Sequence, residues 1–291
     1  MRLYQIFPFY IILNSILYLK NLFYDYKLFK RLNITNIPIY SIGSIELGGS
    51  GKTTLTKAFV NMLIQKGKKP AILSRGYKRK GKGNQIVHNG QSFLTNVSYA
   101  GDEPYMLGKF LKTVPIIVDE NKSRGINQLL HYDINCIVID DGYQSRYLNK
   151  KIDIVIINNY HHISNYLIFP YGFLREPIQS LKRADLVFLN SDNNIILEKK
   201  IKKKIAEKTK IFFYSFHYSL YQYSSMNIFN SVKTIKGDFI AFCGIALPQL
   251  FFNQVKKYDI TVKKCIRFKN HQAYNDDIIN CIINYAKKMK I

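Results

Sequence analysis

Tryptophan is absent from this sequence, and cysteines and acidic residues are few. The four cysteines (Cys136, Cys243, Cys265 and Cys281) are widely spaced and form no C-x-x-C pair. This spacing argues against a zinc site or a disulfide scaffold and favours a reducing compartment. Only 19 Asp and Glu residues stand against 43 Lys and Arg, so the formal net charge is +24. Such a charge predicts an anionic partner, such as nucleic acid, lipid headgroups or phosphorylated substrates.

Part of this charge has a simpler origin. Lys, Ile, Asn and Tyr are abundant together, a pattern that AT-rich codons also produce, and we expect no nucleic-acid partner. With 291 residues and 47% hydrophobic content, the chain is large enough for one large or two moderate domains.

A long apolar run occurs at the N-terminus, where residues 3–19 are almost wholly hydrophobic. A spanning helix needs about 20 apolar residues, and Gln5, Pro8 and Asn14 weaken this one. No small-residue cleavage site follows, which argues against a removable signal peptide. We expect residues 1–31 to form a membrane-associated hydrophobic helix, the alternative being a buried first helix. The basic residues behind the run place the rest of the chain in the cytoplasm: Lys20, Lys27, Lys30 and Arg31.

Short apolar runs then alternate with stretches capable of forming helices, which predicts an α/β fold with a parallel sheet covered on both faces. A helix is expected from about Thr53 to Gln65. The expected strands are Ile37–Ile42, Pro70–Ser74, Val114–Val118, Cys136–Ile139, Ile152–Ile157 and Leu186–Leu189.

The pattern changes near residue 214, where a Tyr/Ser/Asn-rich stretch without helical period begins. We therefore expect a P-loop NTPase-like domain at residues 32–213, a linker at 214–236 and a small C-terminal α/β domain at 237–291. The lysine-rich run 199–210 is interpreted as a solvated helix face.

A glycine-rich loop, G-G-S-G-K-T at residues 48–53, lies between a predicted strand and a predicted helix. In that context backbone amides and the helix N-terminus bind phosphate oxygens, a Lys reaches the terminal phosphates and a Thr hydroxyl can bind Mg²⁺. Glu46 occupies the first Gly position of the strict motif. The candidate nucleotide-binding residues are Gly48, Gly49, Ser50, Gly51, Lys52, Thr53 and Thr54.

Asp140 and Asp141 end a predicted apolar strand. Ligands bind at the carboxyl ends of parallel strands, so these acids are candidate Mg²⁺ ligands; the alternative is an acidic turn or helix cap. Asp102 and Glu103 offer two more carboxylates in a Gly-Asp-Glu-Pro sequence that also suits a helix start.

Three further motifs are less specific. The loop containing Arg75 and Tyr77 follows a strand and is either a phosphate-binding loop or a solvated one. Arg175 has the geometry suited to phosphate oxygens. His271 stands alone, and a lone His is more often structural than catalytic.

In their order along the chain, these motifs resemble the tetraacyldisaccharide 4′-kinase family of lipid A synthesis. The set consists of the apolar N-terminus, G-G-S-G-K-T at 48–53, S-R-G-Y at 74–77, G-D-E-P at 101–104, D-D-G-Y-Q at 140–144, G-F-L-R-E-P at 172–177 and H-Q at 271–272. The resemblance covers nearly the whole chain. No single motif is decisive, but the ordered set is highly specific.

The resemblance implies an enzyme on the cytoplasmic face of the bacterial inner membrane that transfers the γ-phosphate of ATP, with Mg²⁺, to the 4′-hydroxyl of a lipid A disaccharide 1-phosphate. It also implies two α/β domains joined by a two-stranded linker, with the active site between them. We expect a monomer.

The resemblance further assigns roles to individual residues. Asp102 would be the base toward the sugar hydroxyl, assisted by His271, and Lys52 and Arg175 would stabilise the transferred phosphoryl group. The implied metal ligands are Thr53, Asp140, Asp141 and Glu103, and the implied substrate-binding residues are Arg75, Tyr77 and Gln144.

Four departures from the family accompany these assignments. Ser145 replaces the His usual after D-D-G-x-Q, and Lys78 replaces the Gly after S-R-G-Y. Asn270 stands where an Asp usually precedes the His. Family members also continue into a T-E-K-D motif that this sequence does not contain, so we expect a truncated second domain.

Two alternatives remain at this point. A membrane-bound ATPase that positions or partitions cargo would share the phosphate loop, although Leu47 replaces the signature Lys of that class. A nucleotide-binding relic without turnover would share every motif.

Overall fold

The computed structural model describes residues 7–158, 167–190, 195–203, 205, 208–215, 220–223, 229–232, 237–258 and 260–289. The chain divides into two compact units, residues 1–215 and residues 216–291. The sequence pattern predicts a further division, into a domain at 32–213, a linker at 214–236 and a domain at 237–291. These limits stay predictions.

The first unit contains a sheet of eight strands in the order β3-β4-β2-β5-β1-β6-β7-β8. All neighbouring pairs are parallel except β3 and β4. Its strands are β1 (Ile39–Gly43), β2 (Pro70–Ser74), β3 (Gln85–Asn89), β4 (Pro115–Val118), β5 (Cys136–Asp140), β6 (Ile152–Ile157), β7 (Leu186–Asn190) and β8 (Lys210–Tyr214). Its helices are α1 (Phe7–Asp25), α2 (Lys52–Gln65), α3 (Val97–Ala100), α4 (Asp102–Phe110), α5 (Lys122–Leu129), the 3-10 helix η3 (Ile178–Arg183) and α6 (Ile195–Lys202).

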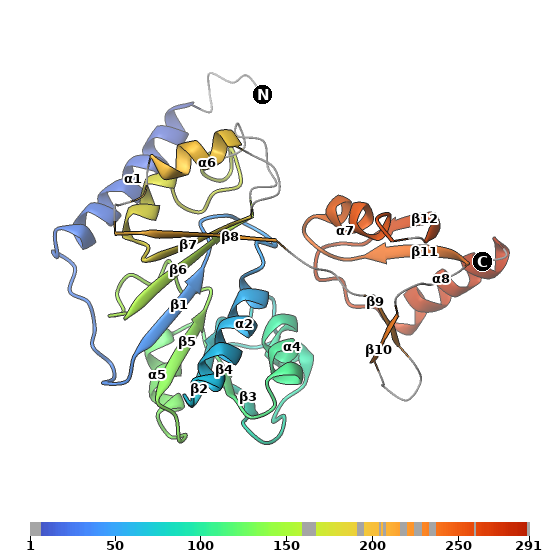
Figure 1. The fold of residues 1–291 in the computed structure, drawn as a ribbon, viewed down its shortest axis with the longest axis horizontal. Coiled ribbons are helices and arrows are strands. Elements are labelled where there is room, and N and C mark those ends of the chain that lie inside the picture. Colours follow the sequence, from blue (N-terminus) through green and yellow to red (C-terminus); the bar gives the residue numbers. More distant parts are fainter. Residues whose placement is uncertain are drawn as a thin grey trace. The chain divides into compact units, whose positions relative to one another are not determined.

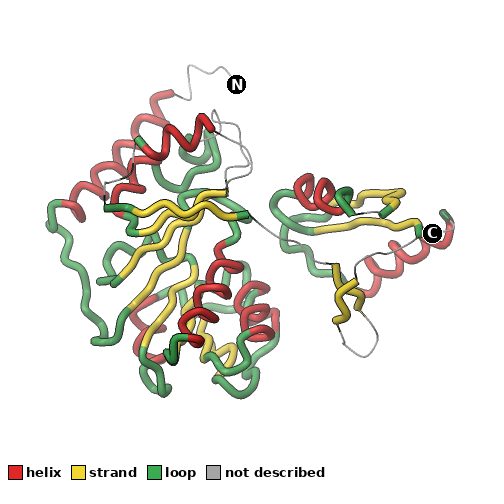
Figure 2. Tube along the Cα trace, in the orientation of Figure 1, coloured by secondary structure: helices red, strands yellow, loops and turns green. Residues whose placement is uncertain are grey.

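Helices cover both faces of this sheet, as its apolar strands require (Figure 1). Ile154 of β6 belongs to the core beneath α2 and α4, whereas its neighbour Val155 belongs to the core beneath α1 and α6. Successive strand residues point to opposite faces, so one apolar strand serves both cores. The predicted α/β class with a mostly parallel sheet is confirmed, and Figure 2 shows its strands between helices.

Helix α1 packs one of its faces against the core of the first unit and exposes another face to solvent. Leu13 and Leu17 contact the core beneath α1, while Ile12 and Ile16 are each 56% exposed. Within the described residues, no helix combines the length and hydropathy needed to cross a bilayer.

The second unit is small and is described by itself. A parallel pair, β11 (Asp238–Cys243) and β12 (Thr261–Arg267), carries α7 (Pro248–Val255), and α8 (Asp276–Lys288) follows β12. An antiparallel pair, β9 (Leu220–Tyr223) and β10 (Phe229–Val232), precedes them. This pair lies within the stretch predicted as a linker.

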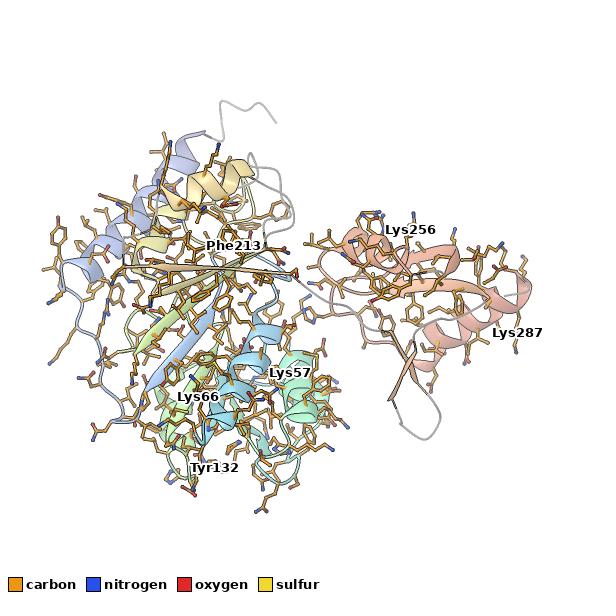
Figure 3. The ribbon with its side chains drawn as sticks, in the orientation of Figure 1. Lys57, Lys66, Tyr132, Phe213, Lys256 and Lys287 are labelled. Atoms are coloured by element: carbon orange, nitrogen blue, oxygen red, sulfur yellow. The ribbon has the colours of Figure 1, made fainter. Side chains whose placement is uncertain are left out.

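Several boundaries differ from the predicted ones. Strands β2 and β6 have the predicted limits, but β3 and β8 were not predicted, and α6 ends at Lys202 instead of continuing through the lysine-rich run. Figure 3 shows the side chains of the described residues on the same ribbon.

Candidate active site

The glycine-rich loop joins β1 to the N-terminus of α2. Gly48 and Gly51 have φ angles of 88° and 82°, a region that residues with a Cβ rarely adopt. Gly51 is the N-cap of α2, so the first amides of α2, which lack partners within the helix, point toward the N-terminal end where the loop lies. This is the backbone arrangement that binds phosphate oxygens.

Glu46, in the first Gly position of the strict motif, has a structural role. Its buried carboxylate accepts a hydrogen bond from the backbone N–H of Asn158, at the end of β6, over 2.8 Å. The side-chain amide of Asn158 then donates to the carbonyl of Gly49 over 2.6 Å. Glu46 and Asn158 therefore brace the phosphate loop against the neighbouring strand.

Lys52 and Arg175 converge on Asp141. The Lys52 ammonium lies 3.7 Å from a carboxylate oxygen of Asp141 and also donates to the Ser50 hydroxyl. Arg175 Nη1 contacts both oxygens of the same carboxylate, at 3.0 and 2.8 Å. Burial alone would raise the pKa of Asp141, but Lys52 and Arg175 outweigh it and lower the pKa. Asp141 therefore stays charged and holds both cations beside the phosphate loop.

Asp140 is fully buried at the carboxyl end of β5. Its oxygens accept hydrogen bonds from the hydroxyls of Thr56, at 3.1 Å, and Ser74, at 3.4 Å. Burial, followed by repulsion from Glu103 and Asp141, raises the pKa of Asp140 to about 6. Glu103, in the first turn of α4, is therefore close enough to this strand end to affect Asp140.

The predicted residues of α4 lie beside the basic loop after β2. Asp102 and Glu103 occupy the exposed first turn of α4 behind Gly101, whose φ is 87°. A Cβ on Gly101 would lie 3.3 Å from the backbone oxygen of Tyr77, so the G-D-E-P and S-R-G-Y motifs pack directly together. The structure therefore brings both motifs to the edge that carries the phosphate loop.

Lys122 belongs to this site, and sequence reasoning missed it. It begins α5 just after β4, its side chain is buried, and its Nζ has no hydrogen-bond partner among the described residues. Burial lowers its pKa to about 8, against the attraction of Asp140 and Asp141. The available signal was its position after the carboxyl end of a parallel strand, where ligands bind.

We expect Lys122→Met to lower kcat/KM about tenfold to a hundredfold, because a cation beside the phosphate loop is lost. The melting temperature should stay equal or rise, because an unpartnered buried ammonium is removed. Steady-state kinetics and thermal unfolding check both statements. The exposed Lys112→Met is the control, and unchanged kinetics for Lys122→Met would exclude a role in the site.

Gln144 and His271, two other predicted residues, lie in different parts of the structure. The Gln144 amide donates to the Ser44 carbonyl over 3.0 Å and so supports the loop after β1. His271 lies in the second unit with a φ of 60°, and its backbone N–H donates to the Gly244 carbonyl over 2.9 Å. Because each unit is described by itself, the predicted partnership of His271 with Asp102 and the predicted cleft between the domains stay predictions.

The residues at the strand ends fit a magnesium ion bound together with phosphates. The described residues contain no group of three His, Cys, Asp or Glu side chains that would hold a metal ion alone. Mg²⁺ bound with a nucleotide needs only one or two carboxylates, because phosphates and waters complete its coordination. Asp140 is buried and is repelled by Glu103 and Asp141, so a bound cation would offset this repulsion and stabilise its charged form. Thr53, in the first turn of α2, has the position that supplies a hydroxyl.

Comparisons with known proteins cover almost the whole chain. The model of the tetraacyldisaccharide-1-P 4′-kinase family matches residues 3–291. Tetraacyldisaccharide 4′-kinase of Chlorobium limicola is 32% identical over 287 residues, which covers 94% of this chain and 79% of that protein. The protein of the same name from Halothermothrix orenii is 30% identical over 298 residues, covering 96% and 77%. The crystal structure of LpxK from Aquifex aeolicus in complex with ATP matches with a TM-score of 0.74 and 28% identity, covering 94% of this chain and 83% of that one.

Proposed function

The chain belongs to the tetraacyldisaccharide-1-P 4′-kinase family, and from this premise we propose how its residues divide the work of the reaction. The enzyme transfers the γ-phosphate of ATP to the 4′-hydroxyl of a tetraacyldisaccharide 1-phosphate in lipid A biosynthesis. ATP is the co-substrate, and Mg²⁺ accompanies it. Neither the partitioning ATPase nor the relic is favoured, because the family match extends over both units.

The observation that carries the proposal is the convergence of Lys52 and Arg175 on Asp141 beside the phosphate loop. Phosphoryl transfer needs alignment and positive charge more than covalent assistance. Because Asp141 holds both cations before the nucleotide binds, little reorganisation is needed when phosphate charge arrives. Lys52 and Arg175 thus neutralise the transferred group, and Asp141 positions them.

Asp102 is proposed as the general base. A sugar hydroxyl is a weak nucleophile, and a carboxylate that accepts its proton accelerates the attack. Asp102 is exposed at the start of α4, beside the loop of Arg75 and Tyr77, so an acceptor can approach it. Asp140 and Thr53 would hold Mg²⁺, which supplies charge neutralisation when bound.

The enzyme is further proposed to work as a monomer on the cytoplasmic face of the inner membrane. Support for the membrane contact comes from α1, whose exposed side chains Ile12, Ile16, Leu19 and Phe23 follow one another at intervals of four, three and four residues. These positions share one face of the helix, and it differs from the face by which Leu13 and Leu17 pack on the core of the first unit. An amphipathic helix of this kind lies in the membrane interface.

The test of function is a labelled-ATP assay on a lipid A disaccharide 1-phosphate in detergent micelles, with a parallel measurement of nucleotide hydrolysis. Label on the 4′-position of the sugar is the expected result. Hydrolysis that does not depend on the lipid would support the ATPase instead, and nucleotide binding without either reaction would support the relic.

A further inference from the structure

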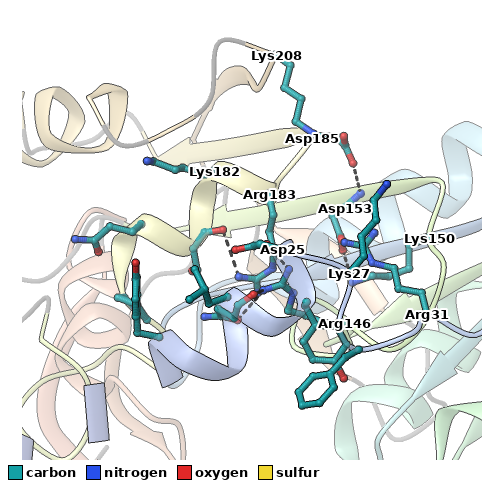
Figure 4. A pocket seen from close by; sticks show the side chains of 18 of the residues that line it. Asp25, Lys27, Arg31, Arg146, Lys150, Asp153, Lys182, Arg183, Asp185 and Lys208 are labelled. Carbon is teal, nitrogen blue, oxygen red and sulfur yellow. Dashed lines mark hydrogen bonds and ion pairs between the residues drawn. The ribbon is translucent and has the colours of Figure 1, made fainter. Parts of the chain in front are cut away.

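A cavity of about 980 Å³ lies in the first unit away from the phosphate loop (Figure 4). Its walls come from the end of α1 and the following segment, the residues ahead of β6, the segment from η3 to β7, and Lys208 ahead of β8. The walls thus meet the amino ends of β6, β7 and β8. Because β1 is parallel to β6, the phosphate loop, which follows the carboxyl end of β1, lies at the opposite end of the strands. The cavity is therefore separate from the kinase site.

The cavity is strongly cationic. Nine Lys and Arg residues line it, against three Asp residues. Asp25 pairs with Arg146, Asp153 pairs with Lys150, and Asp185 accepts a hydrogen bond from the backbone N–H of Asp153. Arg183 pairs with Glu176, which does not line the cavity. The remaining six cations have no ion-pair partner among the described residues: Lys27, Lys30, Arg31, Lys151, Lys182 and Lys208.

Two arginines of the cavity also carry buried donors. The Nε atoms of Arg146 and Arg183 are buried and have no hydrogen-bond partner within the described part of the chain. Burial lowers the pKa of Lys150, Asp153 opposes this, and the nearby charges of Arg183 and Arg31 lower the pKa further. The cavity thus brings several like charges together, and a bound anion would relieve their mutual repulsion.

An apolar surface adjoins this cationic cavity. Tyr18 and Leu22 of α1 line the cavity, while Leu19 and Phe23 of the same turns are 48% and 39% exposed. Phe29, in the segment after α1, lines the cavity and is 44% exposed. A ligand held here would place an anionic group among the cations and could extend acyl chains along α1.

We propose that this cavity binds the phosphate headgroup of an anionic membrane phospholipid. The inference rests on the proposed membrane association and deepens it, because it adds a headgroup site to an apolar anchor. An anchor and a cationic site together bind membranes far more firmly than either alone. The site would orient the enzyme on the leaflet from which its lipid substrate is drawn.

The test is sedimentation of the full chain with vesicles of phosphatidylcholine, with or without phosphatidylglycerol. The variant Lys30→Gln/Arg31→Gln/Lys182→Gln removes three unpaired cavity cations, and Lys66→Gln/Lys68→Gln/Lys112→Gln removes three exposed lysines elsewhere. We expect the cavity variant to lose affinity for phosphatidylglycerol vesicles by at least about tenfold, since each basic residue near an anionic surface adds attraction. The control variant should bind like the unchanged chain.

Additional arms separate the possible failures. A variant with Ile12, Ile16 and Leu19 replaced by Gln should lose binding to both kinds of vesicle, because it lacks the anchor. If the unchanged chain binds no vesicle, membrane association itself fails, whereas equal binding by the cavity variant and the control overturns the headgroup site alone. Inorganic phosphate and glycerol 1-phosphate are titrated separately, and affinity for them matching that for vesicles would show a site for free phosphate. Kinase activity in detergent should be unchanged in every variant, which establishes that the kinase site is intact.

Discussion

Lys52→Ala is expected to lower kcat about a thousandfold, the upper end of the loss seen when one donor to a developing charge is removed. The Lys52 ammonium lies between the Ser50 hydroxyl and Asp141, within the loop that receives the phosphates. Its removal leaves Arg175 as the other cation paired with Asp141 in the described structure. The γ-phosphate then loses both charge neutralisation and alignment.

This experiment separates chemistry from folding. Single-turnover transfer of label from ATP measures the chemical step, and thermal unfolding shows whether α2 is still intact. Lys66→Ala is the matched control, because Lys66 follows the C-terminus of the same helix and is exposed (Figure 3). A Lys52→Ala enzyme that keeps even a tenth of the original rate would contradict the proposed role of the phosphate loop.

The second large effect is expected for Asp102→Ala, which should lower kcat about a hundredfold to ten-thousandfold, the range typical of general-base catalysis. The affinity for ATP should change little, because Asp102 is exposed at the start of α4 whereas the nucleotide is proposed to contact the loop before α2. Kinetics with each substrate varied in turn, together with ATP binding by calorimetry, would reveal this separation.

Asp102→Asn refines the experiment. Asn preserves the shape of the side chain and suits the start of a helix, but it accepts no proton, so its rate should fall as far as that of Asp102→Ala. Asp276→Ala removes an exposed carboxylate from the first turn of another helix, α8, and should have no effect on the rate. Normal turnover by Asp102→Asn would exclude the base role and leave Asp102 a structural one.

The motifs that bind phosphate could be located from the sequence because they are local. Backbone amides, an ammonium and a hydroxyl within six consecutive residues, 48–53, make up most of the loop, so the spacing alone predicts it. The position of Asp140 and Asp141 after an apolar run likewise predicted a strand end, and β5 ends at Asp140. The roles assigned to these residues stay proposals.

Other members of the site depend on contacts between distant segments. A Glu in place of the first Gly of the motif has no evident function in the sequence, since its partner Asn158 lies 112 residues away. Lys122 resembles any solvated lysine until α5 and the strand ends bury it. Strand β3 has only two apolar residues, Ile86 and Val87, between polar ones, and it pairs antiparallel with β4, which lies further along the chain at Pro115–Val118. These features depend on pairing and burial, which local sequence patterns do not encode.

The sequence by itself determined the fold class, the phosphate loop and the family resemblance, because each depends on the order and spacing of neighbouring residues. The tertiary structure decided which charges meet. It gathered Lys52, Asp141 and Arg175 at one edge of the sheet and the cationic cavity at the other. Electrostatic interactions depend on distance and burial, and residues from 18 to 208 become neighbours only after the strands align.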